Sequence, residues 1–252
     1  MKILEKVIVV AALSSFIIPS VSYADFGVGV TGFKKKGDYK NLKDKSLLAL
    51  GLEYRGEKIN LDKGKLSYDF TNSNQYAVEL LMKSNNFGFK AGDSPNFKGM
   101  SRRKQSVDLG GRVIVDTGVG PATFEVTKDV NASKGFQADV KLGGITPHAP
   151  HWTGEREITV AAAAGLRYQS AKAVDYYYGV KSSEATANRK AYKGKAAMTP
   201  YIGLEAQANI TPHVTLNANI GASKKARSIR NSPLTRDGKY ELGASIGINY
   251  WF

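Results

Sequence analysis

Apolar and polar residues alternate along most of the chain after residue 24, most clearly over the last fourteen residues. Between 239 and 252, apolar side chains occupy every even position from Tyr240 to Phe252, including Ile246, while mostly polar or small residues such as Ser245 occupy the odd positions. Successive side chains of a β-strand point to opposite faces, so this pattern predicts a strand with one apolar face. It recurs at 48–54, 76–82, 107–115, 136–142, 158–168, 201–210 and 214–222.

The alternating segments and the connections between them predict a closed antiparallel transmembrane β-barrel. Many segments approach the ~9–11 residues that a tilted strand needs to cross a bilayer, and lipid cannot satisfy an open sheet edge. The expected strands are near 25–33, 45–54, 58–62, 65–70, 75–83, 106–116, 121–130, 135–142, 156–169, 200–210, 214–222 and 239–252.

Connection lengths support this all-β fold class of twelve strands. The long connections 34–45, 84–105, 170–198 and 223–238 all follow odd-numbered strands, which predicts long extracellular loops, short periplasmic turns and two periplasmic termini. The interruption at 62–65 leaves ten strands as the alternative. A soluble periplasmic β-sandwich binding protein would also alternate, but it explains neither the strand lengths nor the loop asymmetry.

Residues 1–24 have the features of a secretory signal peptide. Lys2 and Lys6 precede an apolar run at 7–18 that is too short to span a bilayer, and Ser22-Tyr23-Ala24 resembles a cleavage site. We expect cleavage after Ala24, which leaves a single barrel domain over 25–252 in the outer membrane of a Gram-negative cell.

The amino-acid composition limits the classes of partner that the protein could bind. The absence of cysteine excludes disulfides and cysteine-based zinc sites, and the formal charge of +14 indicates an anionic partner. We expect no nucleic-acid partner, because the chain is exported and lacks a basic helix or an arginine-rich arm.

Several stretches together resemble the MipA/OmpV family of outer-membrane proteins. They are Asp93-Ser94-Pro95, Gly99-Met100, Arg102-Arg103-Lys104, Ser106-Val107-Asp108-Leu109-Gly110, Tyr176-Tyr177-Tyr178-Gly179-Val180, Pro200-Tyr201 with Leu204, Thr211-Pro212-His213, Asn231-Ser232-Pro233-Leu234 and the closing Tyr250-Trp251-Phe252. The family more often has Asp at the position of Asn231. No single motif is specific; their order and spacing carry the resemblance over nearly all of the mature chain.

The resemblance implies an outer-membrane barrel without an agreed catalytic or binding motif, so no site residue is carried over. For the family's namesake it implies an adapter that joins a murein transglycosylase to a murein synthase. A non-enzymatic scaffold for murein remodelling is therefore the first functional hypothesis. A small porin-like channel or a surface adhesin is the alternative.

Catalytic and metal-binding chemistry finds little support in the sequence. His148, His151 and His213 all fall in expected periplasmic turns, and nothing selects the loop residues Asp38 and Asp93 as a catalytic pair. The His148-Ala149-Pro150-His151 spacing suits two metal ligands, but the neighbouring prolines favour a rigid turn. We predict no catalytic residue, no metal site and no cofactor.

Two features bear on ligands. The cluster Tyr176–Tyr178 is either a ligand platform or, as we favour, a loop cluster packed near the headgroups. The expected inward face carries Glu53, Glu79, Asp108, Glu125, Asp139, Glu157, Glu205 and Glu241 against Arg112, Lys141 and Arg167. These charges either pair with one another or form a passage that favours cations.

The excess of positive charge lies in the long loops. Lipopolysaccharide phosphates accept charge-assisted hydrogen bonds from Lys and Arg, so this rim is a candidate contact with lipopolysaccharide or another anionic surface polymer. The alternative is a rim that is merely solvated. The candidate contact residues are Lys34, Lys35, Lys36, Arg102, Arg103 and Lys104.

Overall fold

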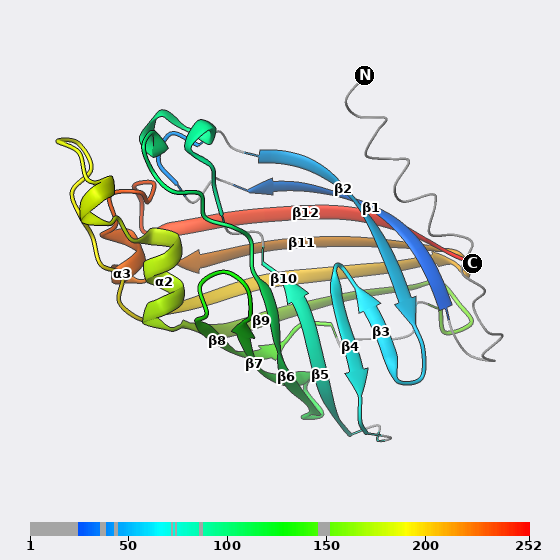
Figure 1. Cartoon of the computed structure of the whole chain (residues 1–252). Coiled ribbons are helices and arrows are strands. Elements are labelled where there is room, and N and C mark those ends of the chain that lie inside the picture. Colours follow the sequence, from blue (N-terminus) through cyan, green and yellow to red (C-terminus); the bar gives the residue numbers. More distant parts are fainter. Residues whose placement is uncertain are drawn as a thin grey trace.

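The described residues form a closed antiparallel barrel of twelve strands (Figure 1). The structure is a computed structural model, and it describes residues 25–35, 39–42, 45–71, 73, 75–85, 88–145 and 152–252. The strands are β1 (Asp25–Lys35), β2 (Lys45–Arg55), β3 (Ile59–Asp62), β4 (Lys65–Asp69), β5 (Tyr76–Ser84), β6 (Val107–Asp116), β7 (Pro121–Asp129), β8 (Phe136–Gly143), β9 (Glu157–Gln169), β10 (Ala197–Thr211), β11 (Val214–Lys224) and β12 (Tyr240–Trp251).

Each strand pairs with its sequence neighbours, and β1 pairs with β12 to close the barrel. All twelve expected strands are present, and the prediction of twelve rather than ten is confirmed. The short hairpin of β3 and β4 is real, with Lys63 and Gly64 in its turn at positive φ. The sandwich alternative is excluded because the sheet has no free edge.

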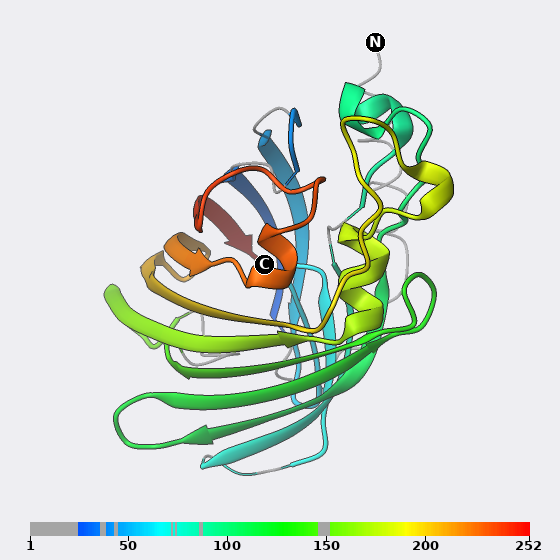
Figure 2. The ribbon, with the colours of Figure 1, turned by 90° about the vertical axis from the view of Figure 1, so that its left-hand side faces the viewer.

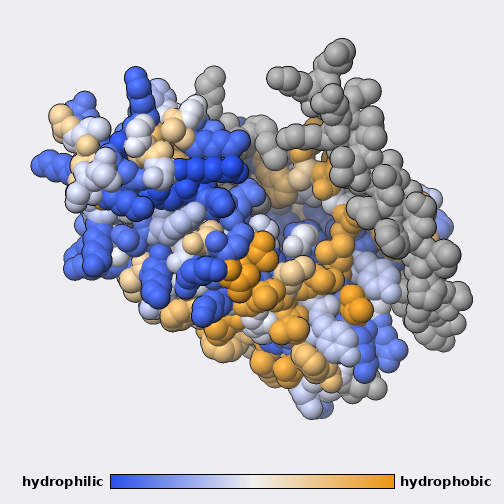
Figure 3. All heavy atoms as spheres, in the orientation of Figure 1, coloured by the Kyte–Doolittle hydropathy of each residue, from blue (hydrophilic) through white to orange (hydrophobic). Residues whose placement is uncertain are grey.

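The barrel wall is apolar outside and polar inside, as alternation requires. Leu48 is 78% exposed, Ile158 76% and Ile246 69%, whereas Glu53, Glu79 and Asn249 on the opposite face are buried. Figure 3 shows apolar residues gathered over the barrel wall and hydrophilic residues around one end. No helix in the described part of the chain is long and apolar enough to cross a membrane.

The two ends of the barrel differ. The long connections that follow β1, β5, β9 and β11 all lie at one end, here called the loop end, together with the short helices (Figure 1). The opposite end, called the turn end, holds the connections that follow the even-numbered strands and the C-terminus. The helices are η1 (Ala91–Asp93), η2 (Pro95–Phe97), α2 (Ala171–Tyr178), η3 (Ser182–Glu184) and α3 (Arg227–Arg230).

Candidate functional site

The long loops pack into one body, called the loop module, which has its own hydrophobic core. Its buried members come from all four long loops and the first residue of β10: Tyr39, Phe89, Phe97, Met100, Val174, Tyr177, Tyr178, Val180, Ala197, Ile229 and Leu234. Figure 2, which looks onto the loop end, shows the segment around α2 and η3 lying beside the segment around η1 and η2. The alternation of apolar residues in the strands gives no signal for this core, because nearly all of its members lie in the connections between strands.

Five of the eleven buried residues of that core are aromatic. Tyr39 meets Phe89, Phe97 and Tyr178 with ring centroids 5.2, 5.5 and 5.6 Å away, and Phe89 stacks on Phe97 at 4.1 Å. Hydrogen bonds connect the loops: the Ser232 hydroxyl donates to the Tyr178 carbonyl at 2.6 Å. These contacts hold the loops together without a disulfide.

Tyr176–Tyr178 belong to this core rather than to a ligand platform. Tyr177 and Tyr178 are buried, and burial raises the pKa of Tyr177 to about 12. The Tyr176 hydroxyl accepts the backbone N–H of Lys104 at 2.9 Å. The cluster is therefore packed, as favoured, and its partners are other loops.

Two buried arginines crosslink the loop module. Arg103 forms a two-pronged pair with Glu184, at 3.1 Å from Nη1 to Oε1 and 2.8 Å from Nη2 to Oε2, and its Nε donates to the Tyr176 carbonyl at 2.7 Å. Arg189 donates to the carbonyls of Glu184, Asn96 and Lys98. Each guanidinium thus joins different loops.

The candidate rim residues divide into two groups. Lys34, Arg102 and Lys104 are exposed at the loop end. Arg103 is 6% exposed and its nitrogens are occupied by Glu184 and backbone carbonyls, so its assignment as a surface contact is wrong. Lys36 and the side chain of Lys35 lie outside the described residues.

The inward charges form ion pairs between adjacent strands or between strands separated by one other strand. Arg112 Nε donates to Glu79 at 2.6 Å, Arg167 lies 3.1 Å from Asp139, and Lys141 lies 3.3 Å from Glu205. Lys83 pairs with Glu125. The alternative in which these inward charges pair with one another is therefore what the structure shows.

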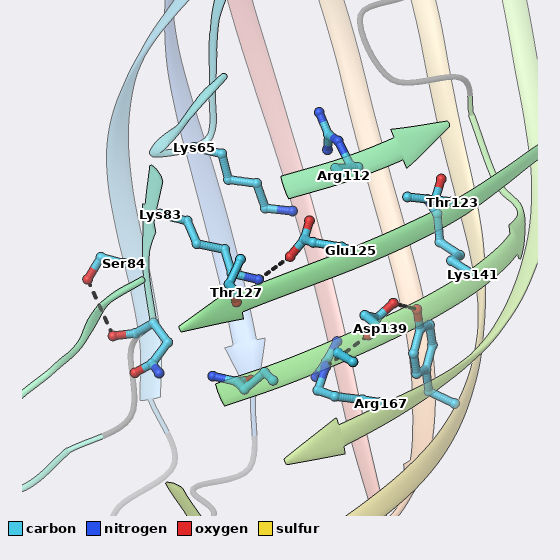
Figure 4. A pocket seen from close by; sticks show the side chains of 14 residues that line it. Lys65, Lys83, Ser84, Arg112, Thr123, Glu125, Thr127, Asp139, Lys141 and Arg167 are labelled. Carbon is cyan, nitrogen blue, oxygen red and sulfur yellow. Dashed lines mark hydrogen bonds and ion pairs between the residues drawn. The ribbon is translucent and has the colours of Figure 1, made fainter. Parts of the chain in front are cut away.

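A cavity of about 400 Å³ lies among these pairs in the barrel lumen (Figure 4). Its wall contains five cationic side chains, from Lys65, Lys83, Arg112, Lys141 and Arg167, but only two carboxylates, Glu125 and Asp139. The expectation of an acid-lined passage is wrong for this part of the lumen. Lys65 was missed because the interruption at 62–65 obscured the register of β4. Lys83, which lies opposite it, shares the odd-numbered inward face of Glu79 and follows from the alternation of β5.

Near the turn end the lumen is filled by a packed polar layer. Trp251 is fully buried, lies against the Arg55 guanidinium at 4.5 Å, and donates from Nε1 to Thr215 at 3.2 Å. Asn249 donates to Glu53 Oε1 at 2.9 Å, and both side chains are buried. This layer joins β2, β11 and β12 through the barrel interior.

His213 is the one histidine among the described residues, and it packs against β12. His213 Nδ1 contacts the Trp251 carbonyl at 2.8 Å, and its ring stacks on Tyr250. His148 and His151 lie outside the described residues. No group of three or more potential metal ligands occurs in the part of the chain that the structure describes.

A family model described as "MltA-interacting protein MipA" matches residues 28–252. The chain belongs to the MipA family. The match spans the barrel from β1 to the last residue, so the resemblance inferred from scattered motifs is confirmed.

Named relatives of this MipA-family chain are outer-membrane proteins. Omp26La of Vibrio anguillarum is 26% identical over 212 residues, which cover 82% of this chain and 80% of the relative. OmpV of Vibrio cholerae is 27% identical over a stretch of the same length and coverage.

Solved barrels also align with the MipA-family chain. The NanC porin aligns over 88% of this chain and 98% of its own, with 12% identity and a TM-score of 0.41. An outer-membrane channel from Pseudomonas putida F1 aligns over 94% and 100%, with 11% identity and a TM-score of 0.41.

Proposed function

We propose that this chain is a non-enzymatic scaffold at the outer membrane, which holds a murein transglycosylase and a murein synthase on the periplasmic side. The family description names an interaction with MltA, and the paired inward carboxylates leave no evident acid–base dyad. A scaffold needs a rigid end and an exposed contact. The packed layer around Trp251 gives the turn end its rigidity.

The observation that carries the proposal is the turn between β6 and β7. Val119 stands at its tip and is 95% exposed, flanked by Gly118 and Gly120 at positive φ. The turn is fixed by bonds from the Thr117 backbone N–H and hydroxyl to the Gly120 carbonyl, at 3.2 and 2.7 Å. A rigidly held apolar tip on a polar rim is a good anchor for a protein partner.

The test is crosslinking and co-purification of murein enzymes from membranes that carry tagged barrel. We expect a transglycosylase and a synthase to be recovered, and Val119→Asp to reduce recovery several-fold. The matched control is Ala187→Asp, which introduces the same charge at an exposed position of the loop end. No murein enzyme with the unmodified barrel, or equal recovery with both variants, contradicts the proposal.

The orientation and processing follow from the same proposal. The turn end, with both ends of the barrel domain 25–252, faces the periplasm, and a signal peptide is removed after Ala24. Residues 1–24 lie outside the described residues. Sequencing the N-terminus of the purified protein should give Asp25 first; an intact residue 1 contradicts cleavage.

We also propose that the exposed part of the basic rim contacts lipopolysaccharide phosphates. Arg102 and Lys104 flank the buried Arg103, so the loop module fixes the backbone that presents them, and Lys34 extends the rim from β1. Phosphate oxygens would accept charge-assisted hydrogen bonds from these side chains.

Binding of detergent-solubilised barrel to lipopolysaccharide tests this contact. Arg102→Gln with Lys104→Gln should weaken binding at low salt, and Lys34→Gln should weaken it further. The loss should shrink at high salt, because screening already removes the attraction. The control pair is Lys58→Gln with Arg156→Gln, both exposed at the turn end. Equal affinity of the two paired variants would refute the contact.

A porin-like channel is the second candidate, favoured by the lumen cavity. Single-channel recording in a planar bilayer separates it from a closed scaffold. Steady ion-conducting steps that change when Lys83 is replaced would support the channel, and their absence would support the scaffold.

A further inference from the structure

The lumen cavity has more hydrogen-bond donors than the protein itself uses. The two oxygens of Asp139 are occupied, one by Arg167 at 3.1 Å and one by the Tyr201 hydroxyl at 2.6 Å. Glu125 accepts from Lys83. The carboxylates of the wall are thus already engaged, while ammonium and guanidinium groups carry several N–H donors each.

Lys65 differs from the other four cations of the cavity wall in its ion pairing. Among the described residues it forms no ion pair, whereas Lys83, Arg112, Lys141 and Arg167 each have a carboxylate partner. Figure 4 shows the Lys65 and Lys83 side chains extending from β4 and β5 toward Glu125, across the cavity wall. Lys65 therefore extends its ammonium group along the cavity wall toward Glu125 without forming a close ion pair.

Two buried hydroxyls supply an independent observation. Thr127 is 2% exposed and Thr123 9% exposed, both line the cavity, and neither Oγ1 has a hydrogen-bond partner. An unsatisfied buried hydroxyl costs about 1–3 kcal/mol, so such groups usually serve a ligand or an ordered water. Thr127 lies beside Lys83 and Thr123 beside Lys141 (Figure 4).

The carboxylates around the site decide how it would select a ligand. Glu79 and Glu205 hold Arg112 and Lys141 from outside the wall. Asp62 is the cross-strand neighbour of Lys65, and Asp108 accepts a bond of 3.4 Å from Gln137. The net field is therefore small, and recognition depends on directed donors rather than on bulk charge.

We propose that this cavity binds a small oxyanion, a phosphate or carboxylate group of a solute. The oxygens would accept hydrogen bonds from Lys65 Nζ and from the N–H groups of Lys83 Nζ that do not bind Glu125. They would also accept from the hydroxyls of Thr127 and Thr123. Such charge-assisted bonds are about twice as strong as neutral ones. The site lies inside the barrel and is independent of the scaffold and of the rim.

A ³¹P NMR titration of inorganic phosphate with purified barrel, in a phosphate-free detergent, tests the site. Unmodified barrel should broaden the phosphate signal saturably, and Lys65→Gln should weaken binding about tenfold, the cost of one charge-assisted hydrogen bond. Thr127→Val should weaken it less. Lys65→Arg, which keeps the charge, should retain it, and Lys58→Gln at the turn end should leave it unchanged.

Acetate added to the phosphate complex shows whether the cavity also binds carboxylate groups. Displacement of phosphate indicates a site for carboxylates as well, and no displacement indicates a site selective for phosphate. Heat-modifiable migration on a gel confirms that each variant forms the barrel. No broadening by unmodified barrel, or equal broadening by folded Lys65→Gln, overturns the proposal.

Discussion

The Arg103 guanidinium and the Glu184 carboxylate meet in a two-pronged pair that joins the β5–β6 loop to the β9–β10 loop, with Nη2 and Oε2 2.8 Å apart. Both side chains are at most 5% exposed. Two backbone N–H groups, of Ser101 and Lys181, complete the shell of Glu184 at 3.0 and 3.2 Å. A pair this well satisfied fixes the relative position of the two loops.

The first prediction is the acid sensitivity of the loop module. Burial alone would raise the pKa of Glu184, but hydrogen bonds from Arg103, Ser101 and Lys181 outweigh it and hold the pKa at about 2. The folded pKa is depressed, so this stabilisation is complete above the unfolded value near 4.5 and is lost as pH falls toward 2. Limited proteolysis of the loops should therefore accelerate between these pH values.

Glu184→Gln is the matched control for that titration. It keeps the shape but leaves Arg103 buried without its counter-charge, which costs about 3–5 kcal/mol. The variant should be cut rapidly at neutral pH, and its remaining cleavage rate should vary less with pH. Unchanged resistance of Glu184→Gln at neutral pH would show that the pair does not order the loops.

The second prediction concerns Tyr177 at alkaline pH. Its folded pKa of about 12 exceeds the ordinary value of 10, so the folded loop module resists ionisation and loses stability as pH rises above 10. Tyr177→Phe should remove this loss at a cost of about 1 kcal/mol at neutral pH, because the Tyr177 hydroxyl donates to the Lys104 carbonyl at 3.3 Å. Tyr177→Ala should cost about 3–5 kcal/mol through the cavity it leaves. Loop proteolysis from pH 9 to 12 measures both.

The third prediction concerns the two faces of β12. Ile246 is 69% exposed on the outer wall, whereas Ser245 faces the lumen and accepts a bond from Asn219 at 3.3 Å. Ile246→Arg should destabilise the barrel in lipid by about 2–4 kcal/mol, because the cation would face hydrocarbon. Ser245→Arg should cost much less. Reversible folding into lipid vesicles measures both, and equal costs would contradict the assignment of faces.

The fourth prediction separates the last two residues of the chain. Trp251→Ala should lower stability by about 3–5 kcal/mol, because it empties the packed layer and strips the Arg55 guanidinium of its aromatic contact. Phe252→Ala should cost far less, since Phe252 is 69% exposed and stacks only on the barrel exterior against Phe26 and Tyr250. The temperature of the heat-modifiable gel transition compares the variants.

Gly27 gives an independent probe of the same layer. A Cβ atom at this position would lie 2.8 Å from the Trp251 ring. Gly27→Val should therefore displace the indole and reproduce much of the loss seen with Trp251→Ala, without removing the aromatic side chain. A fully stable Gly27→Val barrel would show that the layer is not tightly packed.

The strands were predictable because alternation is local: each of β5 to β12 carries its own apolar face in sequence. The loop module was not predictable in this way. Tyr39, Phe97 and Leu234 lie far apart in the chain, and only closure of the barrel brings their loops together. The same holds for Arg103. Its position between Arg102 and Lys104 predicts a surface residue, and only the folded structure shows that it is buried against Glu184.

The lumen site was likewise predictable only where the sequence pattern is local. Periodicity places Arg112, Lys141 and Arg167 on the inner face, and the structure pairs each with a carboxylate of an adjacent strand or one beyond it. Lys65 needed the register of β4 against β5, which a four-residue strand and a two-residue turn do not reveal in sequence.

The pairing of β1 with β12 brings Gly27 beside Trp251, almost the full length of the chain apart. β12 follows the other eleven strands in the chain, so the contact that completes the sheet cannot form until those eleven strands have been made. Such a long-range contact is slow to find, because the ends of a large loop must meet before it contributes any stability. The edges of β1 and β11 therefore stay unpaired until β12 is in place, and removal of the final strand should leave an open sheet rather than yield a smaller barrel.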